Sequence, residues 1–279
     1  MKIILQHPAL NVLILLGFLS FMLWGLLFIR LMVSNGGVRT SRSLVRRGSL
    51  KGVHRALVVV AHPDDAEVYC GGCVAVLARM GIPTTLVICA DGGKIFYQFG
   101  RRLIPNPLNG KGRKLARLRE EEQRRSARIL GIGEVIFLRY PDGLLDGGTL
   151  TGQLKELMER LTPDLVVTFD GEDPSHLEIR DHLAVGRAAL SAAREAGIPR
   201  VLCFSTRRPN VVVDTTPAMS LRWKALAAHR SQFRGVRGRL AVRILRGLAK
   251  RNGAKIGVPY GEAFREIRIT RGSPSSPLQ

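Results

Sequence analysis

Short apolar runs alternate with longer segments of helical composition along most of the chain. The apolar runs are rich in β-branched residues, which favour strands, and they cover residues 56–61, 84–90, 134–138, 164–169, 200–205, 210–214 and 266–270. The helical segments cover residues 73–80, 114–130, 154–161 and 183–196. Strands that alternate with helices are typical of a doubly wound sheet. The pattern predicts an α/β, Rossmann-like fold with a mostly parallel sheet and flanking helices.

The N-terminal part of the chain has a different pattern. Residues 12–29 carry no charge, and with their apolar flanks they form a helix long enough to cross a hydrocarbon core of ~30 Å. A cleaved signal peptide is the competing interpretation. It is disfavoured because Lys2 is the only charge before the apolar stretch and no small-residue cleavage site follows. We predict one N-terminal transmembrane helix over residues 8–33.

The charge of the chain narrows the choice of partners. The formal net charge is +21, from 43 Lys and Arg against 22 Asp and Glu, and such a surface attracts nucleic acid or an anionic membrane. No zinc finger, helix-turn-helix or aromatic-basic platform is found, so we predict a membrane and no nucleic acid as partner. Basic residues directly follow the apolar stretch, which by the positive-inside rule predicts a single-pass membrane protein with a cytoplasmic catalytic domain.

The segment after the predicted span changes in composition. Residues 34–52 are rich in Gly, Ser and Arg and have no hydrophobic period. They are therefore predicted to form a basic juxtamembrane linker, followed by one folded domain over residues 53–279. The four cysteines do not indicate a disulfide framework. Cys70 and Cys73 have the C-x-x-C spacing, but no second pair completes a zinc site, and we interpret them as structural residues.

Candidate metal ligands follow two of the predicted strands. His62, Asp64 and Asp65 come directly after the first strand. An imidazole and a carboxylate from one turn, with a second carboxylate beside them, suit a catalytic zinc site. The alternative is an Asp-rich helix cap with an incidental histidine. His176 and His182 follow the fourth strand, and because parallel strands end at one edge of a sheet, a third ligand could come from there.

Six segments, taken together, resemble one family. AHPDDAEVYCGG resembles the signature AHPDD-x-E-x-x-x-GG of the PIG-L/LmbE-like de-N-acetylases. Further segments are similar to later family motifs and occur in the same order: LVICADGG, REEEQRRSARILGI, FLRYPDGLL, PDLVVTFDGEDPSHLEIRDHLAVGRA and KALAAHRSQF with YGEAF. The resemblance covers residues 56–264. It implies a zinc-dependent hydrolase of a linear amide, an N-deacetylase.

The resemblance also implies roles for individual residues. His62, Asp65 and His182 would hold one Zn²⁺ ion, and Asp64 would be the general base. One position departs from the family pattern, because Ile179 stands where the H-x-x-H motif has its first histidine. His176 is the nearest imidazole in sequence and is our candidate for the acid or oxyanion role, with a surface residue of no role as the alternative. His229 is either a substrate contact or a buried helix residue.

A second feature bears on the membrane. Residues 237–250 place Leu240, Ile244, Leu245 and Leu248 at helical spacing, with arginines on the other faces. A basic amphipathic helix of this kind lies on an anionic bilayer in many proteins. Ordinary packing against the domain, with the arginines in solvent, is the equally open alternative.

These observations lead to one functional hypothesis and two alternatives. The hypothesis is zinc-dependent hydrolysis of the N-acetyl group of an N-acetylglucosamine-type sugar on a lipid-linked or membrane-associated glycoconjugate. The sugar comes from the resemblance, and the lipid carrier comes from the apolar segment and the basic residues. The first alternative is a deacetylase of a soluble sugar conjugate or small metabolite. The second is a catalytically idle membrane adaptor that retains the fold.

Overall fold

The computed structural model describes residues 45–93, 96–99, 102–105, 109–175 and 180–270. They belong to one compact unit, Arg42–Gln279. Within the described ranges no helix is both long enough and apolar enough to span a bilayer. The predicted transmembrane helix, residues 8–33, lies outside the described residues.

An eight-stranded sheet forms the centre of the unit, in the order β1-β9-β10-β8-β7-β2-β3-β6. Neighbouring strands from β8 to β6 run parallel, whereas β10 is antiparallel to both β8 and β9. The prediction of a mostly parallel sheet is therefore confirmed. The strands are β1 Arg46–Gly48, β2 Ala56–Val60, β3 Thr84–Ala90, β6 Glu134–Tyr140, β7 Leu165–Phe169, β8 Arg200–Phe204, β9 Val211–Asp214 and β10 Gly261–Arg268, with a separate hairpin of β4 Phe96–Phe99 and β5 Arg102–Pro105.

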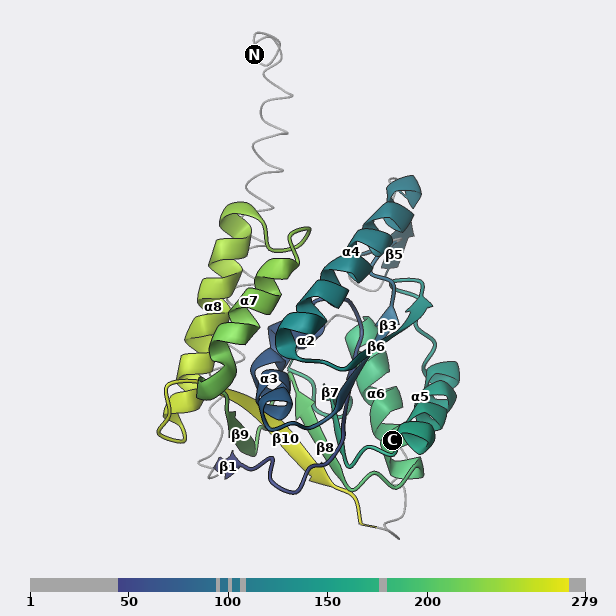
Figure 1. Cartoon of the computed structure of the whole chain (residues 1–279). Coiled ribbons are helices and arrows are strands. Elements are labelled where there is room, and N and C mark those ends of the chain that lie inside the picture. The colour runs from purple at the N-terminus through teal and green to yellow at the C-terminus, as the bar shows by residue number, and fades with distance from the viewer. Residues whose placement is uncertain (1–44, 94–95, 100–101, 106–108, 176–179, 271–279) are drawn as a thin grey trace. The chain divides into compact units, whose positions relative to one another are not determined.

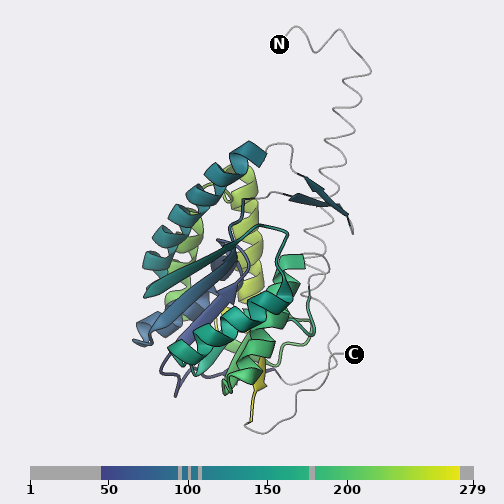
Figure 2. The ribbon, with the colours of Figure 1, turned by 90° about the vertical axis from the view of Figure 1, so that its right-hand side faces the viewer.

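Helices cover both faces of the sheet, as Figures 1 and 2 show. Helices α5 and α6 pack together on one face, while α3, α4 and α7 pack together on the other and α8 lies against β10. The bounds are α2 Asp65–Tyr69, α3 Gly71–Arg79, α4 Asn109–Leu130, α5 Gly147–Leu161, α6 Arg180–Glu195, the 3₁₀ helix Thr216–Ala218, α7 Met219–Ala228 and α8 Gly235–Ala254. The flanking helices predicted from the apolar pattern are confirmed.

The central strands are buried on both faces, which explains their continuous apolar runs. All five residues of β2 and all five of β7 are buried, as expected for parallel strands between two helical layers. The thiols of Cys70 and Cys73 are also buried, and burial raises the pKa of each. A protonated, inaccessible thiol is a poor nucleophile and metal ligand, so the structural interpretation of this pair is confirmed.

Several strands differ from the prediction: β4 and β5 were not predicted, and two further differences concern the central sheet. Arg46–Gly48 lies within the segment predicted as a linker, yet it pairs in parallel with Val211–Val213 and so belongs to the sheet. Strand β10 begins at Gly261, earlier than predicted, because residues 261–264 pair with β9 in antiparallel register. Neither contact is local in sequence, so the apolar pattern carried no sign of either.

A buried ion pair fixes the chain where β7 ends. The carboxylate of Asp170 accepts two hydrogen bonds of 2.7 Å from Arg265 on β10 and two more from the backbone N–H groups of Glu172 and Asp173. Burial alone would raise the pKa of Asp170, but Arg265 and the backbone donors hold it below its ordinary value. The loop between β7 and α6 therefore starts from an anchored residue.

We expect Asp170→Asn to lower the free energy of unfolding by about 3 kcal/mol at pH 7, because it leaves Arg265 without its buried partner. The pKa of Asp170 is lowered by folding, so its contribution is present above the unfolded pKa of ~3.9 and is lost as pH falls through the folded pKa. Urea unfolding at pH 7 and pH 3 measures the free energy of unfolding of the parent and the variant. The variant and the parent should converge at low pH, and the exposed Glu159→Gln serves as control. An equal difference at both pH values would contradict the ion-pair argument.

Candidate metal centre and active site

Side chains from three strand ends meet at the carboxyl edge of the sheet. His62 lies in the turn after β2, Asp65 is the first residue of α2, and His182 lies in the first turn of α6. Asp142 follows β6, and Asp181 precedes His182. Parallel strands β2, β3, β6 and β7 all end at this edge, which brings residues far apart in sequence into one cluster.

His62, Asp65 and His182 have the geometry of a metal site. Their donor atoms all lie within 4.8 Å of one another. Asp65 Oδ2 is 3.6 Å from His62 Nδ1 and 3.4 Å from His182 Nε2. Asp65 Oδ2 also accepts a 2.7 Å hydrogen bond from the His62 backbone N–H, which fixes the carboxylate between the two imidazoles. The structure therefore brings together the three ligands that the resemblance implied.

The other nitrogen of His62 faces two further carboxylates. Its Nε2 is 3.2 Å from Asp181 Oδ2 and 3.5 Å from Asp142 Oδ1. Asp181 Oδ2 in turn accepts a 2.7 Å hydrogen bond from the Gly143 backbone N–H. A carboxylate on the far nitrogen of a ligating histidine orients the ring and increases its basicity. Asp181 and Asp142 thus support His62 as a ligand through Nδ1.

The electrostatics of the cluster favour a cation. Burial lowers the pKa of His62, but the carboxylates of Asp142, Asp181 and Asp65, which accept hydrogen bonds from the protonated ring, raise it well above its ordinary value. Burial raises the pKa of Asp65, yet His182 and His62 more than offset this and hold it far below its usual range. Three carboxylates around His62 thus favour positive charge at this position. A divalent cation with nitrogen and oxygen ligands fits these residues.

Aromatic packing and a glycine set the position of His182. Its ring stacks on Phe169, the last residue of β7, with centroids 4.1 Å apart, and meets Tyr69 edge-on at 5.8 Å. Helix α6 approaches β7 closely because it carries Gly186, where a Cβ would lie 2.8 Å from the Phe169 carbonyl oxygen. These contacts hold the ring against the sheet and leave it one orientation.

Asp64 is held beside the cluster by an unusual backbone and a buried arginine. Its φ of 101° lies in a region that non-glycine residues rarely adopt, and its N–H donates to Gln123 Oε1 at 2.9 Å. Arg119 Nη2 lies 3.2 Å from Asp64 Oδ1 and also donates to the Pro63 carbonyl, while Nη1 donates to that of Gly92. Burial raises the pKa of Asp64, and Arg119 opposes the shift.

His229 is fully buried behind the cluster. Its Nε2 is 3.3 Å from Glu67 Oε2, and Glu67 Oε1 accepts hydrogen bonds from Gln123 and Ser126. Burial lowers the pKa of His229, but Glu67 raises it above its ordinary value, which favours an ion pair. This placement favours a partnered core residue over the substrate contact that was the other prediction. The pair connects α7 to α2 directly behind Asp64.

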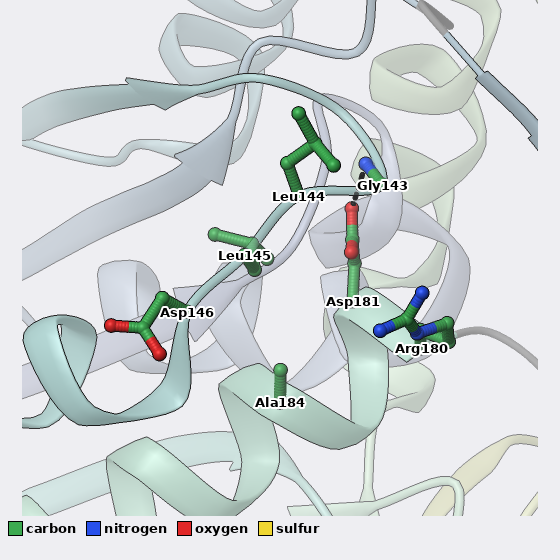
Figure 3. Close-up of a pocket in the computed structure, with 7 residues that line it drawn as sticks. All are labelled: Gly143, Leu144, Leu145, Asp146, Arg180, Asp181 and Ala184. Carbon is green, nitrogen blue, oxygen red and sulfur yellow. Dashed lines mark hydrogen bonds between the residues drawn. The ribbon is translucent and has the colours of Figure 1, made fainter. Parts of the chain in front are cut away.

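A cavity of about 320 Å³ opens beside the metal-binding cluster, and Figure 3 shows its walls. It shares Asp181 with the cluster and is of a size that suits a small polar group of a substrate. It is lined by Gly143, Leu144, Leu145, Asp146, Arg180, Asp181 and Ala184.

Sequence reasoning missed some residues of the site and placed one that the structure does not describe. His176 lies outside the described residues, so its catalytic role stays a prediction. Asp142 and Asp181 were not singled out, although each follows a strand and Asp181 directly precedes His182. Arg119 was quoted only as part of a motif, and nothing in the sequence indicated that its side chain reaches back to Asp64.

Comparisons with known proteins agree with this site. The profile of the PIG-L family, described as GlcNAc-PI de-N-acetylase, matches residues 57–193. The probable N-acetyl-α-D-glucosaminyl L-malate deacetylase 2 of Bacillus subtilis is 28% identical over 64% of this chain and 84% of the relative. The diacetylchitobiose deacetylase of Thermococcus kodakarensis is 26% identical over 77% of this chain and 84% of the relative.

A solved structure supports the same conclusion. The N,N'-diacetylchitobiose deacetylase from Pyrococcus horikoshii aligns with a TM-score of 0.68 and 26% identity, over 86% of this chain and 91% of that chain. The chain belongs to the PIG-L/LmbE-like family, whose named relatives are deacetylases, hydrolases of an amide bond.

Proposed function

We propose that this protein hydrolyses the N-acetyl group of an N-acetylglucosamine-type sugar. The observation that carries the proposal is the placement of Asp64 beside three metal-type ligands, His62, Asp65 and His182. The printed names of the relatives, which act on glucosaminyl malate and on diacetylchitobiose, support an N-acetylated amino sugar as the substrate.

Zinc is the metal that we assign to the site. Two imidazoles and one carboxylate are a ligand set of catalytic zinc, which keeps a further coordination position open. A zinc ion held by His62, Asp65 and His182 would supply a Lewis acid that activates water and polarises the acetyl carbonyl. Calcium and magnesium prefer sites made of oxygen ligands alone, so the imidazoles disfavour them.

The residues of the chain divide the remaining work. Asp64 accepts the proton of the attacking water and can return it to the leaving amine. Arg119 holds the Asp64 carboxylate through its 3.2 Å contact and keeps the surrounding turn in place through the Pro63 and Gly92 carbonyls. Asp181 keeps the His62 ring oriented. His176 remains our candidate for stabilising the oxyanion.

We also propose that the sugar is carried on a lipid-linked or membrane-associated glycoconjugate. The uncharged stretch of residues 12–29 and the basic residues after it support this, and they also support a single-pass location with a cytoplasmic domain. The alternative is a soluble sugar conjugate, with the apolar segment serving only to tether the enzyme. The malate and chitobiose conjugates in the relatives' names favour this alternative.

Asp64→Asn is expected to keep the metal and to lower kcat by ~100-fold or more, because the amide cannot accept a proton from water. Amine release from a soluble N-acetylglucosamine conjugate measures turnover, and elemental analysis measures zinc. Glu159→Gln, an exposed acid-to-amide change on α5 outside the cavity, is the control. Turnover near that of the parent in a zinc-loaded variant would remove Asp64 from the mechanism. A parent protein that binds zinc without turnover would favour the idle adaptor.

His62→Ala and His182→Ala are each expected to abolish stoichiometric zinc binding, since each removes a ligand. Asp181→Asn should weaken zinc affinity by ~10–100-fold, as is typical when a supporting carboxylate is lost. Competition with a chromogenic chelator measures the affinities. The exposed His54→Ala is the matched control for loss of a histidine. Zinc affinity unchanged in either alanine variant would refute that ligand assignment.

The single-span topology predicts that protease added to sealed, right-side-out vesicles leaves the C-terminal domain intact. The physical reason is the block of arginines after the apolar stretch, which favours retention on the cytoplasmic side. Immunoblotting of the C-terminus measures the protection. Digestion in these vesicles with protection in inverted ones would reverse the orientation, and a fully soluble mature form would support a signal peptide.

A further inference from the structure

All charged residues in helices α7 and α8 are basic. No acidic residue occurs between Asp214 and Glu262, so the formal charge of this stretch is entirely positive. Arg222 is buried and paired with Glu262 of β10, whereas the basic residues of α8 have no carboxylate within the stretch with which to pair. The basic residues of this stretch are Arg222, Lys224, Arg230, Arg234, Arg237, Arg239, Arg243, Arg246, Lys250, Arg251 and Lys255.

The structure separates the two faces of α8. Ile244, Leu245 and Leu248 are half-buried, and Ala249 is fully buried, on the side that packs against β9 and β10. The opposite side holds an exposed stripe of four cations at positions 239, 243, 246 and 250. Their spacing of four, three and four residues places them on one face of a helix. None of the four has an ion pair within the described part of the chain.

The exposed face also has apolar side chains at its N-terminal end. Val236 is 71% and Leu240 is 44% exposed, and both belong to the first turns of α8. Trp223 of α7 lies beside this face, between the guanidinium groups of Arg222 at 4.9 Å and Arg246 at 5.4 Å from its ring centroid. Cations with exposed aliphatic side chains and an adjacent tryptophan form the composition of an interfacial membrane surface.

We propose that the outer face of α7 and α8 docks on the surface of an anionic phospholipid bilayer. Clustered Lys and Arg side chains bind anionic headgroups, and apolar side chains enter the interface. Val236 and Leu240 favour a bilayer over nucleic acid, because phosphate contacts need no aliphatic insertion. The charge complementarity stands on described residues and does not depend on the apolar N-terminal segment or on the reaction catalysed.

Docking of this face would bring the active site to the membrane. Helix α7 ends at Ala228. The next residue, His229, contacts Glu67 close to Asp64, and only a short loop separates this end from the start of α8. In Figure 1 the start of α8 lies beside the end of α7. The exposed Val236 and Leu240 are therefore at the end of the helix pair that is closest to the site.

A fluorescent probe on α8 tests the proposal in the full-length protein. The four native cysteines are buried, so a thiol-reactive, environment-sensitive dye labels a single introduced Leu240→Cys. The protein is added to, or reconstituted into, phosphatidylcholine vesicles. One set of vesicles also contains about 30 mol% phosphatidylserine, which gives an anionic surface. We expect a blue shift and quenching by brominated lipid only with phosphatidylserine. The dye reports the environment of α8 alone. Attachment of the protein through an N-terminal anchor would therefore give the same dye signal in vesicles with and without phosphatidylserine.

Matched charge removal provides the control. Arg239→Gln, Arg243→Gln and Arg246→Gln together should lower the lipid-dependent signal by at least ~10-fold, since each cation near an anionic surface contributes several-fold to binding. Lys114→Gln, Arg128→Gln and Arg160→Gln remove the same charge at exposed positions outside α7 and α8 and should leave the signal unchanged. Turnover of a soluble sugar conjugate should be unaffected by both triple variants, which keeps this test separate from the proposed reaction.

Three results would overturn the proposal. The first is an equal probe signal in neutral and anionic vesicles. The second is an equal loss in both triple variants, which would indicate a response to net charge alone. The third is a shift caused by single-stranded RNA but not by phosphatidylserine vesicles, which would assign the face to nucleic acid.

Discussion

The arrangement of the site depends on how the negative charge of several carboxylates, buried at one edge of the sheet, is balanced. A buried charge without a partner costs several kcal/mol, so each carboxylate must find a cation or hydrogen-bond donors. Glu262 is paired with Arg222, and Glu67 with His229. Asp64 is paired with Arg119. The cluster of Asp65, Asp142 and Asp181 instead shares two imidazoles, and a bound divalent cation would complete its compensation.

The same contacts connect the site to the helix layers. Arg222 of α7 donates to the Glu67 and Val68 carbonyls of α2, while its guanidinium also meets Glu262 of β10. Glu262 in turn accepts from the start of α3. Helix α7 therefore fixes the turn that carries His62 and Asp65 from behind. The inner side of α7 thus contacts the segment that carries the candidate ligands, whereas the outer side of the α7 and α8 pair carries basic residues.

The resemblance identified the candidate ligands, and elementary reasoning about parallel strands predicted that they converge. His62 and Asp65 lie three residues apart, and His182 follows a neighbouring strand of the same sheet. The pairing partners of Asp64 and Glu67 could not be predicted, because Arg119, Gln123 and His229 reach them across sequence separations of more than fifty residues. Short strands such as β1 were also missed, since three residues give no periodicity.

The sequence by itself determined the strand and helix alternation, the family and the candidate ligands that follow β2 and β7, because these depend on local pattern and on motif spacing. Only the tertiary structure decided that Asp142 and Asp181 support His62, that His229 is buried against Glu67, and which face of α8 is exposed. The physical reason is that burial and charge pairing belong to the packed chain. A residue's type limits what it can contact, but the layers of the fold decide which partner it meets.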